Sequence, residues 1–417
     1  MSEARAHPIP IDQARDQLMA SITAISGDER ISIDMAVGRI AGKDVASAIN
    51  LPATHNAAVD GYGILASTLH ANPAMQFKIV GIARAGHPFD GIIGEGEAVE
   101  IYTGGVMPTG PDCVAMHEDC VRESAMVRID VALETGSNMR PPGENLGKGE
   151  AVIARGQTIT PALIGQLAAS GTADILVRRR LKVAVLSTGD EVVSADQDAR
   201  HGQIYDANRP MLKAMLQNMA IGPSVEVIDS GIVPDNLSAL AAAYDHALAT
   251  ADVVISSGGA SDGIEDHTQA AMRQIGADCA FWRLAMKPGR PMAVGRKGQK
   301  LIFCLPGNPV AAFVCTKLLI TPLLTRLGGG VDLPILKIAV PAGFTHRKKS
   351  GRAEYLRVIL ASDADTDCTI LHLHGRKGAG VISSLTGADG LVEIPLDNAG
   401  VTTGMKLNFL PFHERGL

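Results

Sequence analysis

Aromatic residues are scarce in this chain of 417 residues: they make up 3% of it, although 46% of the residues are hydrophobic. Its cores must therefore be built mainly from alanine, valine, isoleucine and leucine. No apolar run reaches the roughly 20 uninterrupted residues of a membrane span. The first ten residues, MSEARAHPIP, lack the apolar segment of a secretory signal. These absences predict a cytoplasmic protein with no membrane partner.

Three further absences narrow the function. A formal net charge of −6 provides no basic footprint, so no nucleic-acid partner is expected. The six cysteines include no C-x-x-C pair and have no histidine at zinc-finger spacing, which predicts reduced thiols rather than disulfides or structural zinc. The glycine-containing turns match neither the Walker pattern nor the Rossmann fingerprint, which disfavours a P-loop kinase and a nicotinamide dehydrogenase.

Glycine and proline are abundant, with 45 and 22 residues, and they lie mostly at turns between apolar runs. A chain of this length is expected to hold two to four domains. One helix is predicted to begin with Pro10 in its first turn and to end before Gly27. A second is predicted between its N-cap Thr160 and Gly171. The segment between them has the pattern of short strands, so we interpret it as an insertion into a domain built from both flanks.

Strand-like and helix-like runs alternate over Leu181–Gly330, which predicts a mostly parallel, three-layer α/β domain. Asp235 is the expected cap of one of its helices. Asn308 is the expected cap of the last helix, which should kink at Pro322. Only strand-like runs follow, typical of a small β-barrel. The predicted units are residues 1–28 with 148–180, then 29–147, 181–328 and 329–417.

Polar sequences that contain glycine follow three of the predicted strands: STGDE (Ser187–Glu191), SSGGASDGIEDHT (Ser256–Thr268) and LPGNP (Leu305–Pro309). Ligands of an open α/β sheet bind where the strands end. Glycine turns and helix N-termini at that edge favour an anion. Three such turns therefore predict a phosphate or pyrophosphate pocket, with Gly258 and Gly259 in the second turn.

Acidic residues crowd the same turns. Carboxylates would repel a phosphate unless a divalent cation lies between them, and Mg²⁺ is held by one or two carboxylates together with phosphate oxygens. Glu191 and Asp266 are therefore candidate Mg²⁺ ligands. Helix capping alone is the alternative for Asp266, and Asp262 is left undecided.

Two basic clusters complement these acids. AMKPGRP carries Lys287 and Arg290, and GRAEYLRV carries Arg352. Exposed lysines and arginines usually serve solubility, but prolines stiffen the first loop and reduce the entropy lost on binding an oxyanion. Ser383 and Ser384 could add hydroxyl donors, although a bare serine pair would be assumed to be part of a turn.

These segments, in their order, resemble the molybdopterin molybdenumtransferases, the family of MoeA and the gephyrin E domain. NAAVDGY (Asn56–Tyr62) is similar to the family segment N-S-A-M-D-G-Y, and GEAVEIYTGGVMPTGPDCV to G-E-x-x-x-I-x-T-G-A-x-x-P-x-G-A-D. GENLGKGE, STGDEV, GQIYDANRP, SSGGAS, MKPGRP and LPGNPV follow in the expected order. Each marks a separate turn, and together they span roughly 300 residues.

The resemblance implies an elongated two-segment domain, an inserted β domain, an α/β domain like the molybdopterin adenylyltransferases, and a C-terminal barrel. It also implies a homodimer whose cleft combines the α/β domain of one subunit with the β domain of the other. The implied reaction inserts molybdate into adenylylated molybdopterin, with Mg²⁺-dependent release of AMP. Transient contacts with other proteins of cofactor biosynthesis and with apo-molybdoenzymes are implied as well.

The matching motifs also imply the roles of individual residues. The expected catalytic residues are Asp60, Thr103, Glu191 and Asp266, the last two of which would hold Mg²⁺. The expected molybdate-binding residues are Lys287, Arg290, Arg352 and one of Ser383 and Ser384. The expected substrate-cleft residues are Asp206, Asn208, Gly258, Gly259 and Ser261.

The chain also departs from the family pattern. His55 and Ala57 stand where the family usually has Asp and Ser, and Asp262 takes a position that is usually apolar. Arg290 replaces a lysine, which keeps the charge but changes the geometry. His267 stands where an aromatic ring is common. A paralogue with altered activity therefore stays open.

Two other functions stay open at this stage. The α/β domain alone could adenylylate molybdopterin with ATP, but that reaction would not need the β domain or the barrel. The chain could instead be a non-catalytic dimeric scaffold that binds molybdopterin. A scaffold would need none of Asp60, Glu191 and Asp266, so their joint presence favours an enzyme.

Overall fold

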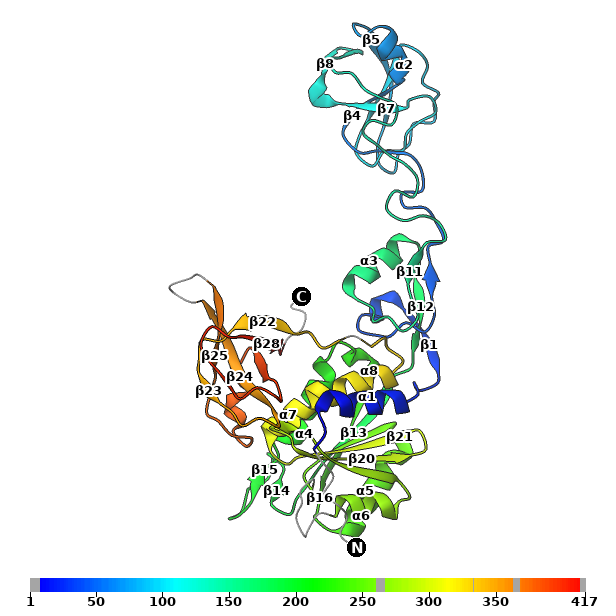
Figure 1. The fold of residues 1–417 in the computed structure, drawn as a ribbon. Helices are drawn as coiled ribbons and strands as arrows, with labels where there is room; N and C mark the ends of the chain where they lie inside the picture. The colour runs from blue at the N-terminus through cyan, green and yellow to red at the C-terminus, as the bar shows by residue number, and fades with distance from the viewer. Residues whose placement is uncertain (1–7, 260–266, 333, 363–367, 413–417) are drawn as a thin grey trace.

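The computed structural model describes residues 8–259, 267–332, 334–362 and 368–412. Figure 1 shows an elongated molecule whose β-rich segment, drawn in light blue and cyan, stands apart at one end. A narrow connection of two chain segments joins it to a stalk, and the stalk leads to the α/β sheet and the C-terminal strands. The chain is therefore a multidomain α/β protein.

The stalk is built from two segments that lie far apart in the sequence. β1 (Asp28–Ser32) pairs antiparallel with β12 (Asp174–Arg178), so the two flanks of the β-rich segment meet in one small sheet. α3 (Pro161–Ala169) begins as predicted, because the hydroxyl of its N-cap Thr160 accepts a hydrogen bond from the Leu163 N–H at 3.3 Å. This cap and the proline that follows it confirm the second predicted helix.

The first helix differs from its prediction at both ends. α1 (Ile11–Ser21) starts after Pro10, which is the N-cap residue, and it stops well before Gly27. The chain beyond it is extended, and the Ile25 N–H donates to the Leu327 carbonyl at 2.8 Å. This contact with a distant helix ends the local helical pattern.

A six-stranded sheet forms the β-rich end, in the order β7-β4-β6-β5-β9-β8. Phe77 and Val127 lie in its fully buried core. The short α2 (Ala66–Ala71) follows β4. The strands are β4 (Gly61–Ile64), β5 (Gln76–Ala83), β6 (Glu97–Ile101), β7 (Cys113–Met116), β8 (Cys120–Glu123) and β9 (Met126–Ile129). The pairs β2 (Val45–Ala46) with β11 (Ala151–Ile153), and β3 (Asn56–Ala57) with β10 (Met139–Arg140), join this end to the stalk.

The α/β part contains a six-stranded sheet in the order β16-β13-β17-β21-β20-β18. The first four strands in that order are parallel and the last two pairings are antiparallel. The strands are β13 (Leu181–Thr188), β16 (Val225–Val233), β17 (Val253–Ser257), β18 (Asp278–Arg283), β20 (Pro291–Lys297) and β21 (Lys300–Leu305). The sequence prediction of a mostly parallel sheet is confirmed.

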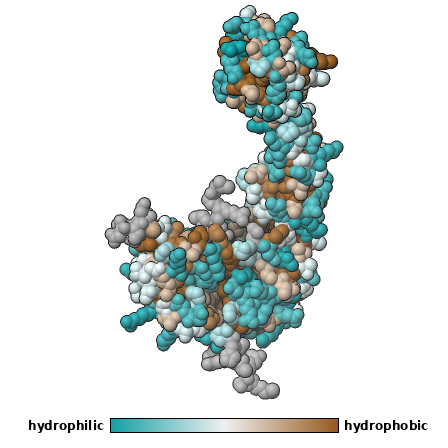
Figure 2. Space-filling view, turned by 45° about the horizontal axis from the view of Figure 1, so that its top comes forward, coloured by the Kyte–Doolittle hydropathy of each residue, from teal (hydrophilic) through white to brown (hydrophobic). Residues whose placement is uncertain are grey.

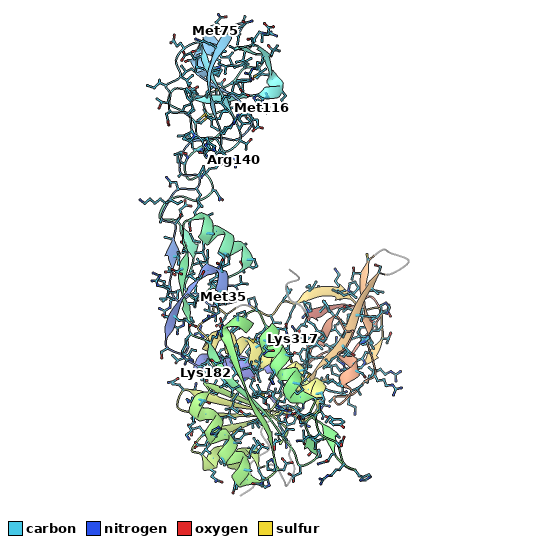
Figure 3. All side chains as sticks on the ribbon, turned by 180° about the vertical axis from the view of Figure 1, so that it is seen from behind. Met35, Met75, Met116, Arg140, Lys182 and Lys317 are labelled. Atoms are coloured by element: carbon cyan, nitrogen blue, oxygen red, sulfur yellow. The ribbon has the colours of Figure 1, made fainter. Side chains whose placement is uncertain are left out.

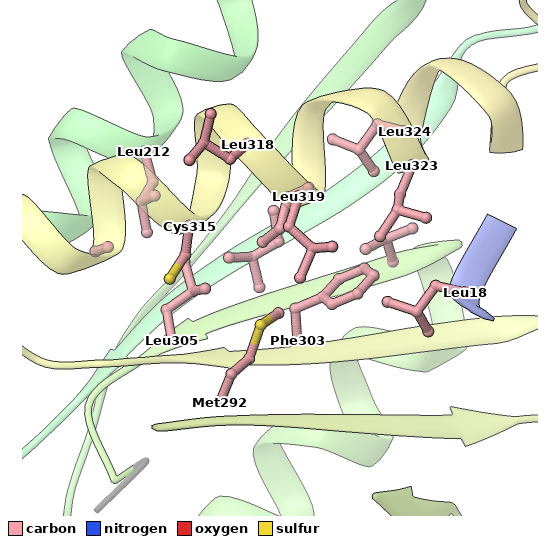
Figure 4. Packing of buried hydrophobic residues seen from close by; sticks show 14 of the residues in the cluster. Leu18, Leu212, Met292, Phe303, Leu305, Cys315, Leu318, Leu319, Leu323 and Leu324 are labelled. Carbon is pink, nitrogen blue, oxygen red and sulfur yellow. The ribbon is translucent and has the colours of Figure 1, made fainter. Parts of the chain in front are cut away.

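Helices cover both faces of this sheet, which gives the three layers. α4 (Asn208–Asn218), α7 (Pro309–Cys315), α8 (Thr321–Leu327) and α1 pack on one face, and α5 (Leu237–Thr250) and α6 (Thr268–Gln274) on the other. Figure 4 shows the first of these interfaces, where Leu212, Leu318 and Phe303 meet between helix and strand. Aliphatic side chains dominate both clusters, as the low aromatic content predicts.

One expected helix cap is wrong, and another is confirmed in its position. α5 is capped by Asn236, whose side chain accepts from the Ala239 N–H at 2.8 Å, and not by Asp235. Asn308 lies at the N-cap position of α7, yet its side chain makes no capping bond within the described residues. Contacts with Thr188 and Asp190 at the end of β13 take Asp235 away from the local pattern.

The last helical run changes pitch before Pro322. A π-helical stretch, η4 (Thr316–Ile320), separates α7 from α8, because a proline has no N–H to continue the α-helical ladder. The run Pro309–Leu327 is long and apolar enough to cross a membrane by composition alone, but most of it is buried in the core beside the sheet. That burial is what a core helix requires.

The C-terminal strands form a third mixed sheet, in the order β19-β24-β26-β28-β22, with β25 paired to β24. β19 comes from the α/β part of the chain, so the sheet ties the two regions together. A single parallel bridge joins Ala342 to Leu371, but closure of the strands into a barrel stays a prediction. The strands are β19 (Met286–Lys287), β22 (Ile338–Pro341), β24 (Ala353–Ser362), β25 (Thr369–Leu373), β26 (Gly390–Ile394) and β28 (Lys406–Pro411), and β23 (His346–Arg347) pairs with β27 (Gly400–Val401).

Candidate functional site

The carboxyl ends of β13, β17 and β21 lie side by side, since these strands are parallel neighbours. Asn208, the first residue of α4, links two of these ends. Its Nδ2 donates to the Ser257 hydroxyl and to the Gly307 carbonyl, both at 2.7 Å. Its Oδ1 is buried and has no hydrogen-bond partner among the described residues. Asn208 Oδ1 is therefore a hydrogen-bond acceptor at this sheet edge, and its donor is not among the described residues.

Asp206 is a support for this edge rather than an open ligand. Its carboxylate accepts from the Ser187 hydroxyl at 2.9 Å and from Arg209 Nε at 2.9 Å. Arg209 is held in turn by Asp229. Since Asp206 is buried and both its oxygens are engaged, it orients the turn that carries Asn208.

The glycine turn after β17 requires glycine at two positions. Gly258 and Gly259 have φ angles of +106° and +65°. A Cβ on Gly258 would lie 2.4 Å from the Thr188 carbonyl oxygen, and one on Gly259 would lie 2.6 Å from the Thr268 hydroxyl. The glycine turn therefore packs directly on the end of β13. Because glycine has no side chain, the backbone of the turn is exposed at the strand edge.

Acidic side chains gather beside the end of β13. Glu191 is exposed, and its carboxylate folds over Gly189, where a Cβ would approach its Oε2 to 2.5 Å. Asp235, which the sequence prediction treats only as a helix cap, accepts from the Thr188 hydroxyl at 2.7 Å. Its N–H donates to Asp190 at 3.0 Å. Asp235 is the residue that sequence reasoning missed here, because its strand neighbour lies far away in the chain.

Of the two candidate Mg²⁺ ligands, the structure describes only Glu191. Asp266 and Ser261, and the undecided Asp262, lie outside the described residues. Among the residues that the structure does describe, no three His, Cys, Asp or Glu side chains form a group that could hold a metal ion. The Mg²⁺ assignment of Glu191 and Asp266 therefore stays a prediction.

The basic residues lie where β19 meets the C-terminal sheet. Lys287 pairs with Glu354 across β19 and β24, which places the preceding Arg352 close to the same strand pair. The Lys287 side chain is 60% exposed and its Nζ lies 3.3 Å from Glu354 Oε1. The Leu284 N–H donates to the Arg290 carbonyl at 2.7 Å and so closes the loop. Lys287, Arg290 and Arg352 are all exposed.

The two candidate serines have different environments. Ser384 is fully buried; its hydroxyl accepts from Arg357 Nε at 2.9 Å and donates to the Val381 carbonyl at 2.6 Å. Burial lowers the pKa of Arg357, and the Ser384 hydroxyl is the acceptor for its buried Nε. Ser383 is exposed. The geometry favours Ser383 over Ser384 as the hydroxyl that a ligand can reach.

A second candidate centre lies at the β-rich end. The Thr103 N–H and hydroxyl both donate to Asp60 Oδ1 at 2.7 Å. The backbone hydrogen bond, the hydroxyl and the charge of His117 lower the pKa of Asp60 below its usual range. Asp60 is therefore an exposed, fixed carboxylate that stays ionised in mild acid.

A pocket of about 260 Å³ adjoins Thr103. Arg140 and Glu144 line it together with Asn56. Sequence reasoning did not select Arg140 or Glu144, although the segment GENLGKGE contains Glu144 and was noted as a motif. The pairing of β3 with β10 places Arg140 opposite Asn56, whose Nδ2 donates to the Gly104 carbonyl at 3.1 Å.

The two centres do not meet within one chain. Asp60 and Thr103 belong to the β-rich end, whereas Glu191, Lys287 and the glycine turns belong to the α/β and C-terminal end. Figure 3 shows the separation from behind: Met116 and Arg140 are labelled at one end, and Lys182 and Lys317 at the other. The fold and site define a class of protein: an elongated multidomain α/β protein with a polar, glycine-rich sheet edge and a remote fixed carboxylate.

Comparison with known proteins gives the family. Three family models match in order: the MoeA N-terminal region (domain I and II) over residues 9–171, the probable molybdopterin binding domain over 184–326, and the MoeA C-terminal region (domain IV) over 339–412. The chain is 33% identical over 410 residues to a molybdopterin molybdenumtransferase of Haemophilus influenzae, covering 97% of this chain and 99% of that one. A relative of the same name from Nostoc sp. is 33% identical over 78% of this chain and 76% of its own length.

Solved structures agree with this likeness. A molybdopterin biosynthesis MoeA protein from Pyrococcus horikosii has 29% sequence identity and a TM-score of 0.78, with 98% of this chain and 100% of that chain covered. The chain belongs to the MoeA family of molybdopterin molybdenumtransferases, and it is an enzyme of that family. The family resemblance found in the sequence is confirmed.

Proposed function

We propose that this enzyme inserts molybdenum from molybdate into adenylylated molybdopterin and releases AMP. The observation that carries the proposal is the presence of two complementary centres in a chain that covers 99% of a relative named molybdopterin molybdenumtransferase. One centre offers exposed cations at the AMKPGRP loop, and the other a fixed carboxylate at Asp60. A reaction that joins an oxyanion to a nucleotide-bearing pterin needs both kinds of group.

Molybdate is a tetrahedral dianion and is well bound by cations and hydroxyl donors. Lys287, Arg290 and Arg352 are exposed around the β19–β24 pairing and supply the cations. Ser383 supplies a hydroxyl. These four side chains form the proposed oxyanion subsite.

The nucleotide part of the substrate is assigned to the strand ends. Gly258 and Gly259 let the turn pack on the end of β13, and the buried Asn208 Oδ1 at the same edge has no partner among the described residues. Glu191, which follows the end of β13 and is exposed, is the described carboxylate that would hold Mg²⁺ at this edge, because hard cations prefer carboxylate oxygens. When bound there, Mg²⁺ would neutralise charge on the phosphates.

A homodimer is part of the proposal, because one chain keeps its two centres apart. α3 is apolar and largely uncovered, and the neighbouring Met35 and Val37 are 68% and 44% exposed. Figure 2 shows hydrophobic residues at the surface along the stalk. A self-complementary apolar face is what a two-fold interface requires. The four-unit division, the cytoplasmic location and the contacts with other biosynthetic proteins stay predictions.

The test is to mix the purified protein with adenylylated molybdopterin, Mg²⁺ and molybdate, and to follow AMP release. AMP should appear only when molybdate is present. If ATP and molybdopterin give pyrophosphate while the full mixture gives no AMP, the adenylylation alternative holds. Tight binding of molybdopterin without any turnover would support the scaffold alternative.

A further inference from the structure

A buried carboxylate lies directly behind the proposed oxyanion subsite. Glu354 uses both of its oxygens: Oε1 lies 3.3 Å from Lys287 Nζ, and Oε2 lies 2.8 Å from His346 Nε2. The side chains of Glu354 and His346 are 10% and 7% exposed, whereas that of Lys287 is 60% exposed. The Lys287 ammonium group therefore contacts Glu354 on the side that faces the protein and is exposed to solvent on the other side.

His346 extends this chain of contacts to a second lysine. A carboxylate only accepts hydrogen bonds, so His346 Nε2 donates to Glu354. The other ring nitrogen, Nδ1, lies 3.5 Å from Lys377 Nζ. The imidazole thus links the Glu354 carboxylate to a second ammonium group. Lys287, Glu354, His346 and Lys377 are called the Glu354 network below.

The backbone fixes both ends of the Glu354 network. Lys287 and Glu354 are register partners across β19 and β24, and the Ala353 N–H donates to the Ala285 carbonyl at 2.8 Å. The loop with Lys377 is tied to the start of α7, where the Val310 N–H donates to the Ala379 carbonyl at 3.0 Å. Backbone hydrogen bonds therefore help to hold both Lys287 and Lys377 in position, in addition to their side-chain contacts.

The charges of the network favour an anion on its open side. The network contains two ammonium groups and one carboxylate, which leaves a surplus of positive charge at the exposed ends. Burial alone would raise the pKa of Glu354, but the hydrogen bond from His346 and the charge of Lys287 lower it. Lys348 is also buried nearby, with its Nζ donating to the Asn398 carbonyl at 2.7 Å. The carboxylate is thus ionised, and it orients cations that it does not fully neutralise.

We propose that Glu354 and His346 are positioning residues of the oxyanion subsite, and that Lys377 is a further oxyanion-binding residue of that subsite. The inference rests on the proposed role of Lys287 in molybdate binding and extends it to Glu354, which lies within GRAEYLRV, and to His346 and Lys377, which lie outside the motifs. A lysine held in place loses less freedom when an anion binds than a lysine free in solvent does.

The effect of Glu354→Asp on the half-maximal molybdate concentration distinguishes a positioning role of Glu354 from a purely electrostatic one. Glu354→Asp keeps the negative charge but shortens the side chain, so it cannot keep contact with both Lys287 and His346. Positioning predicts that the half-maximal molybdate concentration for AMP release rises by about fivefold to tenfold, with kcat changed by less than about twofold. Electrostatics alone predicts no change, because the charge remains.

Two further variants complete the design. Lys377→Met should raise the half-maximal molybdate concentration by roughly tenfold. Lys406→Met, an exposed lysine on β28 and the matched control, should leave it unchanged. His346→Gln, which keeps an N–H donor for Glu354, should stay close to wild type, whereas His346→Leu should behave like Glu354→Asp. Thermal denaturation of each variant identifies any loss of folding.

The outcomes are distinct from those of the proposed function. Direct molybdate binding, measured by titration calorimetry on the full chain, should weaken in Lys377→Met even if AMP release is never observed. A wild-type enzyme that is active with molybdate, together with an unaltered Lys377→Met, overturns this inference and leaves the proposed function intact. If these variants change the half-maximal concentration of the adenylylated substrate instead, the subsite holds its phosphate and the assignment to molybdate is wrong.

Discussion

Ser383 and Ser384 are adjacent and chemically identical, yet their surroundings give them different tasks. Ser384 is the partner of the buried Arg357 guanidinium, and Ser383 is open to solvent. Glu191 and Asp235 show the same effect, because contacts with distant strand ends decide what each carboxylate can do. At the residue scale, function here follows burial and partners more than residue type.

Substitution of the two serines should separate these tasks. Ser384→Ala leaves Arg357 Nε buried without its acceptor and should lower the free energy of unfolding by about 2 kcal/mol. Ser383→Ala should leave stability unchanged and raise the half-maximal molybdate concentration by roughly fivefold. Chemical denaturation and the AMP-release assay measure the two effects. The opposite pattern would assign the ligand to Ser384.

The pH dependence of the enzyme should report on Asp60. Hydrogen bonds from Thr103 lower the pKa of Asp60, so its carboxylate persists to a lower pH than an ordinary aspartate. Thr103→Val removes the hydroxyl bond, keeps the backbone bond and raises that pKa towards its usual value. The acid limb of the pH–rate profile should then move to higher pH, while Thr103→Ser should keep the wild-type profile. An acid limb that does not move in Thr103→Val would remove Asp60 from the rate-determining chemistry.

At the scale of elements, each strand end of the α/β sheet supplies a turn, and neighbouring turns complete one another. The glycine turn after β17 packs on β13, and α4 begins with a side chain that links β17 to the turn after β21. At the start of α5, two adjacent residues have different roles. Asn236 caps the helix, whereas Asp235 accepts a hydrogen bond from Thr188 at the sheet edge.

The different contacts of Asn236 and Asp235 predict opposite effects on stability and AMP release when each residue is replaced by alanine. Asn236→Ala removes a helix cap and should cost about 1 kcal/mol in the free energy of unfolding, with AMP release in the folded protein unchanged. Asp235→Ala should change stability little, because the residue is exposed, and should reduce AMP release. Melting curves and turnover are to be compared for both variants. Equal losses of stability would mean that both residues act as caps.

At the scale of the whole molecule, the long stalk keeps the fixed carboxylate away from the oxyanion subsite (Figure 1). A second chain that docks on the apolar face of the stalk would bring the two kinds of centre together. The dimer is therefore required for activity in this proposal and is more than a means of stability.

Complementation between inactive chains tests this directly. Asp60→Asn and Glu191→Gln chains should each be inactive as homodimers. A heterodimer that carries one of each, isolated with two different tags, should keep one intact cleft and about half of the wild-type activity. A heterodimer as inactive as its parents would place both residues in the cleft of one chain. Light scattering near the 43.5 kDa of a single chain would exclude the dimer altogether.

The sequence by itself determined most helices and strands of the α/β part, though not the edge strand β18, together with the cap of α3 and the family, because these follow from local periodicity, turn residues and ordered motifs. It placed Asp60, Thr103 and Lys287 among the candidates, but it could not join them to their partners. The tertiary structure alone decided that α1 stops at Ser21, that Ser384 is buried, and that Glu354 lies behind Lys287. The reason is physical: these outcomes depend on contacts between residues far apart in the chain, and no local pattern encodes them.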